Sequence, residues 1–255
     1  MKLTLALAFI VTAAIYASVG FGGGSTYTAL LAVSGTPYIL IPIVSLVCNI
    51  CVVSGNSFRY IRGGFVTLSK VWPLLVVSVP AAMIGGMLHV SEALFLGLLS
   101  AALFLAGIRM VFAAPLPDGA AVPALQPSAW IAGMLGGFIG FFSGIVGIGG
   151  GIFLAPFLYR LRWGGAKNIA AICSVFILFN SASGLIGQLS KKSEASYGAE
   201  IIAYWPLILA VLIGGTFGNA LSIRMLKANT LRRITGSLIL IVAARLLLKW
   251  IDTVF

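Results

Sequence analysis

The chain alternates long apolar runs with short polar or glycine-rich breaks. These runs lack the period-two alternation of a membrane β-strand, and most approach or exceed the ~20 residues that a helix needs to cross a bilayer. They predict membrane helices at Leu3–Val19, Tyr38–Ser54, Trp72–Leu88, Ala93–Phe112, Ala129–Val146, Ile169–Leu189, Ile201–Ile223 and Leu238–Ile251. We therefore expect an all-α integral membrane protein.

Composition supports this expectation. The 255 residues are 60% hydrophobic and only 8% charged, whereas soluble domains carry about 25% charged residues. The net charge of +11 is explained by basic cytoplasmic loops, so no nucleic-acid partner is predicted. The first run follows a single Lys2, and we expect it to be a retained helix, not a secretory signal peptide.

Two glycine clusters interrupt the apolar pattern. "ASVGFGGGST" covers residues 17–26 and "GIVGIGGGIF" covers residues 144–153. Each glycine costs a helix roughly 1 kcal/mol relative to alanine, so both clusters predict a helix break. Each break is followed by a second arm of about a dozen residues, Ser25–Gly35 and Ile152–Leu161, which is nearer half a crossing than a whole one.

The chain contains an internal repeat. The Gly-x-Gly-Gly-Gly cluster, a later Ser and Ser-Gly pair, and a Trp-Pro followed by a glycine recur in the same order in the second half. We expect a first membrane repeat at residues 1–112, a linker rich in Pro, Ala and Gly at 113–127, and a second repeat at 128–255. Each half comprises a glycine-broken helical hairpin and three further transmembrane helices.

The charges predict an orientation, because Lys and Arg collect in cytoplasmic loops. If each hairpin enters and leaves on one side while the other helices cross, the three most basic loops share one face. We expect this face to be the cytoplasmic side of the inner membrane; it holds Arg59, Arg62, Lys70, Arg160, Arg162, Lys167, Arg224, Lys227, Arg232 and Arg233. Both termini then lie outside, with Lys2, Lys191, Lys192, Lys249, Glu92, Glu194, Glu200 and Asp252. The halves have inverted topology, as in many secondary transporters.

The glycine breaks are the candidate site. Unsatisfied backbone groups inside a bilayer must be surrounded by protein or water, and the helix N-terminus beyond a break favours an anion. We expect the two breaks to meet near the midplane and to bind an anion through Gly20, Gly22, Gly23, Gly24, Ser25, Thr26, Gly147, Gly149, Gly150 and Gly151. The alternative is that glycines only permit close helix packing, which is our interpretation of the stripe Gly136–Gly144.

Neutral polar residues in the third helix of each half are candidates for the same pathway. Asn49 and Asn180 complete the predicted substrate site, because amides donate hydrogen bonds to an anion without trapping it in an ion pair. Further candidates are Ser54, Asn56, Ser181, Ser183 and Gln188. The alternative for all of them is hydrogen bonding between helices.

The twin Gly-x-Gly-Gly-Gly motifs, in about 250 apolar residues, resemble the TauE/SafE family, also called the sulfite exporter or toluene sulfonate uptake permease family. The resemblance covers essentially the whole chain and implies transport of sulfite or an organosulfonate such as sulfoacetate. The first motif ends in Ser25-Thr26 and the second runs into Ile152-Phe153-Leu154, so the two halves of the site are chemically unequal.

The remaining candidate residues are expected to have structural roles. Arg109 and Arg245 are expected to snorkel toward helix ends. His89 has no metal-ligand companions, so neither a metal nor a cofactor is predicted. No Asp or Glu falls in the middle of an apolar run, where a proton-coupled carrier often has its carboxylate relay. Two alternatives stay open: coupling through the protonation of the anion itself, or simple equilibration of the substrate.

A secondary anion transporter working by alternating access, and not an enzyme, is the favoured function. An anion channel on the same fold is the alternative. A membrane sulfur-relay protein using Cys48 and Cys51 is a further one, although membrane cysteines usually fill apolar space. The small-residue stripes do not distinguish a dimer from an intramolecular helix pair, so no oligomeric state is predicted.

Overall fold

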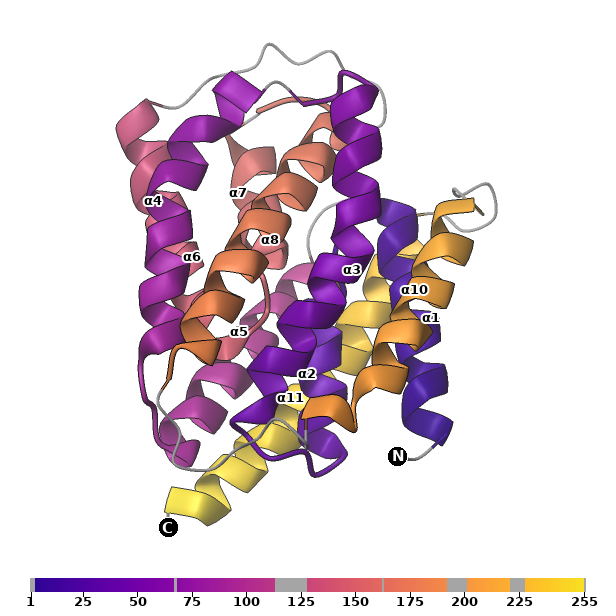
Figure 1. Ribbon diagram of the computed structural model, residues 1–255, viewed down its shortest axis with the longest axis vertical. Coiled ribbons are helices and arrows are strands. Elements are labelled where there is room, and N and C mark those ends of the chain that lie inside the picture. The colour runs from indigo at the N-terminus through magenta and orange to yellow at the C-terminus, as the bar shows by residue number, and fades with distance from the viewer. Residues whose placement is uncertain are drawn as a thin grey trace.

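The computed structural model describes residues 3–66, 68–112, 128–161, 163–191, 201–220 and 228–254. Within these ranges the chain forms helices joined by turns, without a strand, which confirms the all-α prediction (Figure 1). The N-terminal part forms α1 (Leu3–Val19), α2 (Gly24–Val33), α3 (Leu40–Arg62), α4 (Leu68–Met87) and α5 (Glu92–Phe112). The C-terminal part forms α6 (Ala129–Val146), α7 (Gly151–Arg160), α8 (Ala166–Leu189), α10 (Trp205–Ala220) and α11 (Ala228–Val254).

The helix boundaries extend beyond several of the apolar runs. Helix α3 continues past Ser54 to Arg62, and α11 begins at Ala228, well before Leu238. Hydrophobicity marks where lipid or protein surrounds a helix, but the helix itself continues into polar surroundings where the residues permit it. In α3 the last turn carries Arg59 and Arg62. Their positive charges are favoured there by the negative C-terminal end of the helix dipole.

The chain is a multi-pass membrane protein. Four described helices are long and apolar enough to cross a bilayer, at Leu40–Arg62, Glu92–Arg109, Ala129–Val146 and Lys167–Leu189. Shorter apolar helices lie at Leu3–Ser18, Val71–Met87 and Trp205–Asn219. The predicted linker at 113–127 lies outside the described residues.

Small residues set the closest helix contacts. Helix α6 packs on α4 so tightly that a Cβ at Gly140 would collide with the backbone carbonyl of Ser78. One turn to either side, Gly136 and Gly144 meet the carbonyls of Leu74 and Ala82 in the same way. The stripe at Gly136–Gly144 is therefore a packing surface, as predicted. Helices α1 and α10 use the same device, with Gly214 and Gly218 against the carbonyls of Ile10 and Ala14.

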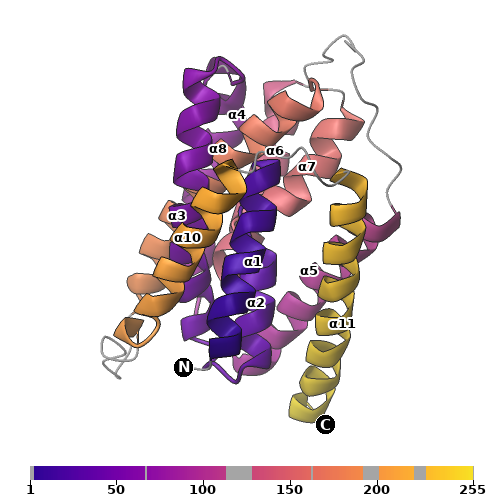
Figure 2. The same cartoon turned by 90° about the vertical axis from the view of Figure 1, so that its right-hand side faces the viewer.

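The two longest central helices, α3 and α8, pack side by side and run in opposite directions (Figure 1). Ser57 and Ser174 share a hydrogen bond of 3.0 Å near one end, and Leu46 lies near Gly184 at the other. Helices α5 and α11 form a second antiparallel pair, visible side by side in Figure 2, with Lys249 of α11 3.5 Å from Glu92 of α5.

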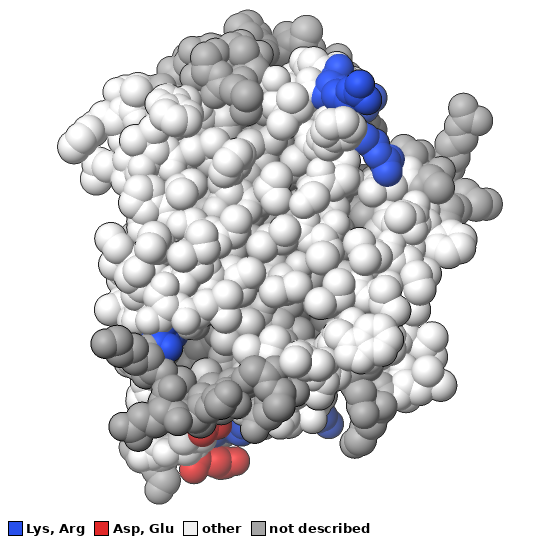
Figure 3. Space-filling model, viewed as in Figure 1, with Lys and Arg blue, Asp and Glu red and all other residues white. Residues whose placement is uncertain are grey.

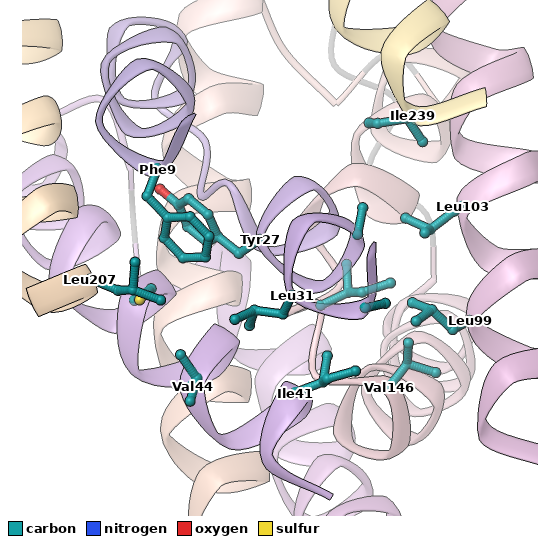
Figure 4. Close-up of a cluster of buried hydrophobic side chains, with 14 of the residues drawn as sticks. Phe9, Tyr27, Leu31, Ile41, Val44, Leu99, Leu103, Val146, Leu207 and Ile239 are labelled. Atoms are coloured by element: carbon teal, nitrogen blue, oxygen red, sulfur yellow. The ribbon is translucent and has the colours of Figure 1, made fainter. Parts of the chain in front are cut away.

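Two apolar cores flank the α3–α8 pair. The larger core gathers side chains of α1, α2, α5, α10 and α11; Phe9 and Tyr27 stack there with ring centroids 4.8 Å apart, next to Leu31 and Val44 (Figure 4). The smaller core is formed mainly by α4, α6, α7 and α8 around Leu158 and Phe176. These cores hold the central helices in place, and with them the glycine breaks.

On the face seen in Figure 3, most charged side chains lie toward the two ends of the molecule, and the middle is formed by uncharged residues. Arg59 and Arg62 end α3 at the upper end in Figure 1, and Lys167 lies 4.5 Å above the Phe65 ring of the adjacent loop. Helix α1 begins and α11 ends toward the opposite end. Several residues of the charge prediction lie outside the described residues, namely Lys2, Arg162, Lys192, Glu194, Glu200, Arg224 and Lys227.

Candidate functional site

The first break separates α1 from α2 where the sequence places its glycines. Helix α1 is closed by backbone bonds from Gly20 N to Ala17 O at 3.1 Å and from Phe21 N to Tyr16 O at 2.9 Å. Gly20 has φ +83° and lies under the Tyr60 ring, which a Cβ would strike. A side chain at this position would therefore meet both backbone strain and a steric clash.

The second break lies between α6 and α7. Gly147, Gly149 and Gly150 all have φ near +80°, a conformation that L-residues with a Cβ avoid. Gly147 N donates to Ser143 O at 2.8 Å and ends α6. Both breaks are thus true unwound segments, each leading into a ten-residue helix.

The two breaks meet at Asn49, near the middle of α3. Asn49 Nδ2 donates to the backbone carbonyl of Ile148 at 2.9 Å. A Cβ at Gly24 would collide with that same carbonyl and with Asn49 Nδ2. A Cβ at Gly149 would lie 2.8 Å from both Asn49 Nδ2 and Ser181 Oγ. The structure therefore brings Gly22, Gly24, Gly149 and Asn49 together from three separate stretches of chain.

Unpaired backbone donors line this meeting point. Among the described residues, the amides of Gly22, Gly23, Gly24 and Ser25 have no hydrogen-bond acceptor, and neither have those of residues 148–152. The first N–H groups of any helix lack intrahelical acceptors, and these two helices carry no side-chain cap. Gly23, Gly24, Gly149 and Gly150 are all buried. Buried donors of this kind are costly unless a ligand or water accepts from them.

The sequence profile of the sulfite exporter TauE/SafE family matches residues 5–246. The chain is also 34% identical over 245 residues to the probable membrane transporter protein y4hK of Sinorhizobium fredii, covering 95% of this chain and 97% of that protein. The chain belongs to the TauE/SafE family. It is a membrane transporter, and no solved structure matches it.

Within this TauE/SafE protein, the remaining predicted site residues divide into two groups. Ser25 is buried beside the first break, and Thr26 Oγ1 lies 3.0 Å from Tyr16 Oη. Neither caps α2, whose N-cap is Gly23. Asn180, by contrast, faces away from the breaks: its Nδ2 donates to Ser78 Oγ at 3.0 Å and to Phe176 O at 2.8 Å.

Ser181, and not Asn180, is the polar residue of α8 that lies next to the second glycine break. Its hydroxyl is fully buried and has no partner among the described residues. Which of these two adjacent residues faces the glycine breaks depends on the rotation of α8 about its own axis. The sequence pattern does not fix that rotation closely enough to choose between neighbouring positions. The Ile148 carbonyl was also missed, because a backbone acceptor has no signal in the sequence.

The other candidates lie away from the breaks. Arg109, Arg245 and His89 are exposed, and the snorkelling expected of the two arginines stays a prediction. Cys48 is buried, Cys51 is half-buried, and both are free thiols. No cluster of three metal-ligating side chains occurs in the described part of the chain.

Proposed function

We propose that this transporter moves a small sulfur-containing anion, sulfite or an organosulfonate such as sulfoacetate, through a site formed by the two glycine breaks. The observation that carries the proposal is the set of unpaired backbone amides that converge on Asn49. Helix N-termini with free N–H groups stabilise anions. The family's description as sulfite exporters supports sulfur oxyanions as the class of substrate.

The packing of helices from one predicted half against helices of the other supports an inverted repeat with alternating access. The first helix of each predicted half packs on the fourth helix of the other, α1 on α10 and α6 on α4. The third helices α3 and α8 pair with each other in opposite directions, as do the fifth helices α5 and α11. A two-fold axis in the membrane plane relates elements in this way in many secondary transporters, where substrate binds between the repeats.

The charge distribution supports an orientation in the inner membrane. The end that carries Arg59, Arg62 and Lys167 is proposed to face the cytoplasm. The end with the Lys249–Glu92 pair then lies outside, as do both termini. Rocking of the two halves around a fixed central site would expose the glycine breaks to each side in turn.

The test is uptake by proteoliposomes that contain the purified protein. We expect saturable flux of sulfite or of one sulfonate in a panel of sulfite, sulfate, sulfoacetate, taurine and toluenesulfonate. Flux that is non-saturating and electrically conductive would identify a channel. A variant with Cys48, Cys51 and Cys173 replaced by alanine is expected to transport as the wild type does, which a sulfur relay would not. Absence of saturable flux for every sulfur anion would contradict the proposal.

A further inference from the structure

The side chain of Asn49 has a fixed orientation and an unused acceptor. Its Nδ2 must face the Ile148 carbonyl, because only the NH₂ group of the amide can donate to it. The carbonyl oxygen Oδ1 therefore lies on the opposite edge of the amide. The side chain is 0% exposed, and Oδ1 has no donor among the described residues. A buried acceptor without a donor is unusual in a folded protein.

This acceptor faces the first glycine break. A Cβ at Gly22 would lie 2.5 Å from Asn49 Oδ1, so any other residue at position 22 would cover the oxygen. Gly22 is also half-exposed, whereas Gly23 and Gly24 are buried. Because Gly22 has no side chain, Oδ1 packs directly against the glycine backbone of this break, whose amides are unpaired.

The site consequently offers two opposite kinds of hydrogen-bonding group. The backbone amides of both breaks require an acceptor, which the negatively charged oxygens of an anion supply. Asn49 Oδ1 requires a donor, and a fully deprotonated anion has none. Such an anion would place its negative oxygens near another acceptor and leave Oδ1 unpaired, which lowers affinity. The Ser181 hydroxyl can adapt to either role, because it both donates and accepts.

No charged side chain of the described helices substitutes for such a donor. Among the described residues, the atoms nearest to a Cβ built at Gly22, Gly24, Gly149 or Gly150 include none from a Lys, Arg, Asp or Glu side chain. The described residues therefore supply no donor to Oδ1.

Resting on the proposed function, we propose that the site selects monoanions that carry a hydroxyl donor of their own, which bonds to Asn49 Oδ1. Within the proposed class of sulfur anions this disfavours sulfoacetate, which at neutral pH is a dianion without a hydroxyl. Two sources supply this chemistry. One is the hydroxyl of a singly protonated inorganic oxyanion, hydrogensulfite. The other is a hydroxyl on the carbon chain of an organosulfonate. Specificity for a substrate hydroxyl arises because its absence leaves a buried protein group unpaired.

A matched pair of sulfonates tests the organic source. Ethanesulfonate and 2-hydroxyethanesulfonate carry the same single charge from pH 5 to pH 8 and differ by one hydroxyl. In wild-type proteoliposomes we expect the hydroxylated anion to have a KM about tenfold lower, the value of one good hydrogen bond. In Asn49→Leu the ratio is expected to fall to near one. Ser54→Ala should keep it, because the structure places this pathway candidate at an exposed position of α3, where its Oγ donates to Ile50 O of the same helix.

The inorganic source is tested with sulfite, which changes from monoanion to dianion as the pH rises through neutrality. If hydrogensulfite is the substrate, the KM is constant when expressed as the monoanion and rises with pH when expressed as total sulfite. The KM ratio of the sulfonate pair and the pH dependence of the sulfite KM are both measured in the wild type. The test therefore does not depend on whether Asn49→Leu folds. Equal KM values for the sulfonate pair together with a pH-independent KM for total sulfite would overturn the inference and leave anion transport intact. Absence of uptake for every sulfur anion overturns both proposals.

Discussion

The backbone of Gly24 lies directly against the carbonyl of Ile148, so that the first residue of α2 touches the second glycine break. This contact joins the two broken hairpins, which are far apart in the sequence, and Asn49 reinforces it by donating to the same carbonyl at 2.9 Å. The site depends on this approach, because a wider separation of the breaks would place their unpaired amides in different environments.

Gly24→Ala is expected to reduce transport strongly. The added Cβ collides with a backbone carbonyl, which yields less easily than a side chain, and overpacking costs about 1–3 kcal/mol. This corresponds to roughly a 5- to 150-fold loss in substrate affinity if the strain falls on the site. Gly55→Ala is the matched control, since the one contact of a Cβ there with the described residues is with Asn219 Nδ2 at 3.8 Å. Equal KM values for the two variants would count against the contact.

The neighbouring serines of α8 should separate binding from stability. Ser181 has no hydrogen-bond partner among the described residues, so Ser181→Ala is expected to leave the unfolding temperature unchanged and to raise the KM about tenfold. Ser183 donates to Val79 O at 2.6 Å, so Ser183→Ala should lower the unfolding temperature with little change in KM. Thermal unfolding in detergent and uptake assays measure the two effects, and the reverse pattern would remove Ser181 from the site.

Gln188 is expected to stabilise the end of α6. Its Nε2 donates to Gly144 O at 2.7 Å and to Ile145 O at 3.3 Å, two carbonyls of the last turn that have no intrahelical donor. Gln188→Ala should cost about 1–3 kcal/mol, because these buried acceptors lose their partner. Ser190→Ala is the control, since Ser190 is exposed and, in the described part of the chain, its Oγ donates to Ile186 O one turn earlier. A thermal-unfolding midpoint equal to that of the control would contradict this role.

Lys191 should lose its proton at a lower pH than an ordinary lysine, because its pKa is lowered. Burial disfavours its charged form and lowers its pKa to about 8, and its Nζ donates to Gln188 Oε1 at 2.7 Å. The unfolded chain holds this proton to about pH 10.4, so the stability contributed at this position rises as the pH increases from about 8. Amine-specific acylation followed by mass spectrometry should label Lys191 half-maximally near pH 8. Labelling delayed to the pH of an ordinary lysine would disprove the shift.

Much of the fold was predictable because bilayer thickness and backbone hydrogen bonding leave few choices. The apolar runs located the spanning helices, and the glycine clusters located both breaks at residues 20–23 and 147–150. The runs failed at the helix ends, as in α3, since a helix continues wherever its backbone bonds remain satisfied. The packing stripe Gly136–Gly144 was also correct, because only small residues admit such close contact.

The candidate site was only partly accessible to sequence reasoning. Asn49 reaches both breaks, as expected. Asn180 instead bonds to Ser78 on α4, and Ser181 lies at the second break where Asn180 was expected. A residue step of one rotates a helical side chain by about 100°, so the choice between adjacent polar residues rests on how α8 packs.

By itself, the sequence determined that this protein lies in a membrane, that its helices break twice, and that the breaks consist of glycine, because these properties follow from local hydrophobicity and backbone freedom. Only the tertiary structure decided that the two breaks touch, that Asn49 bridges them, and that no described residue donates to its carbonyl oxygen. These are long-range relationships, set by the packing of α3 between elements of both halves, and no local pattern encodes them.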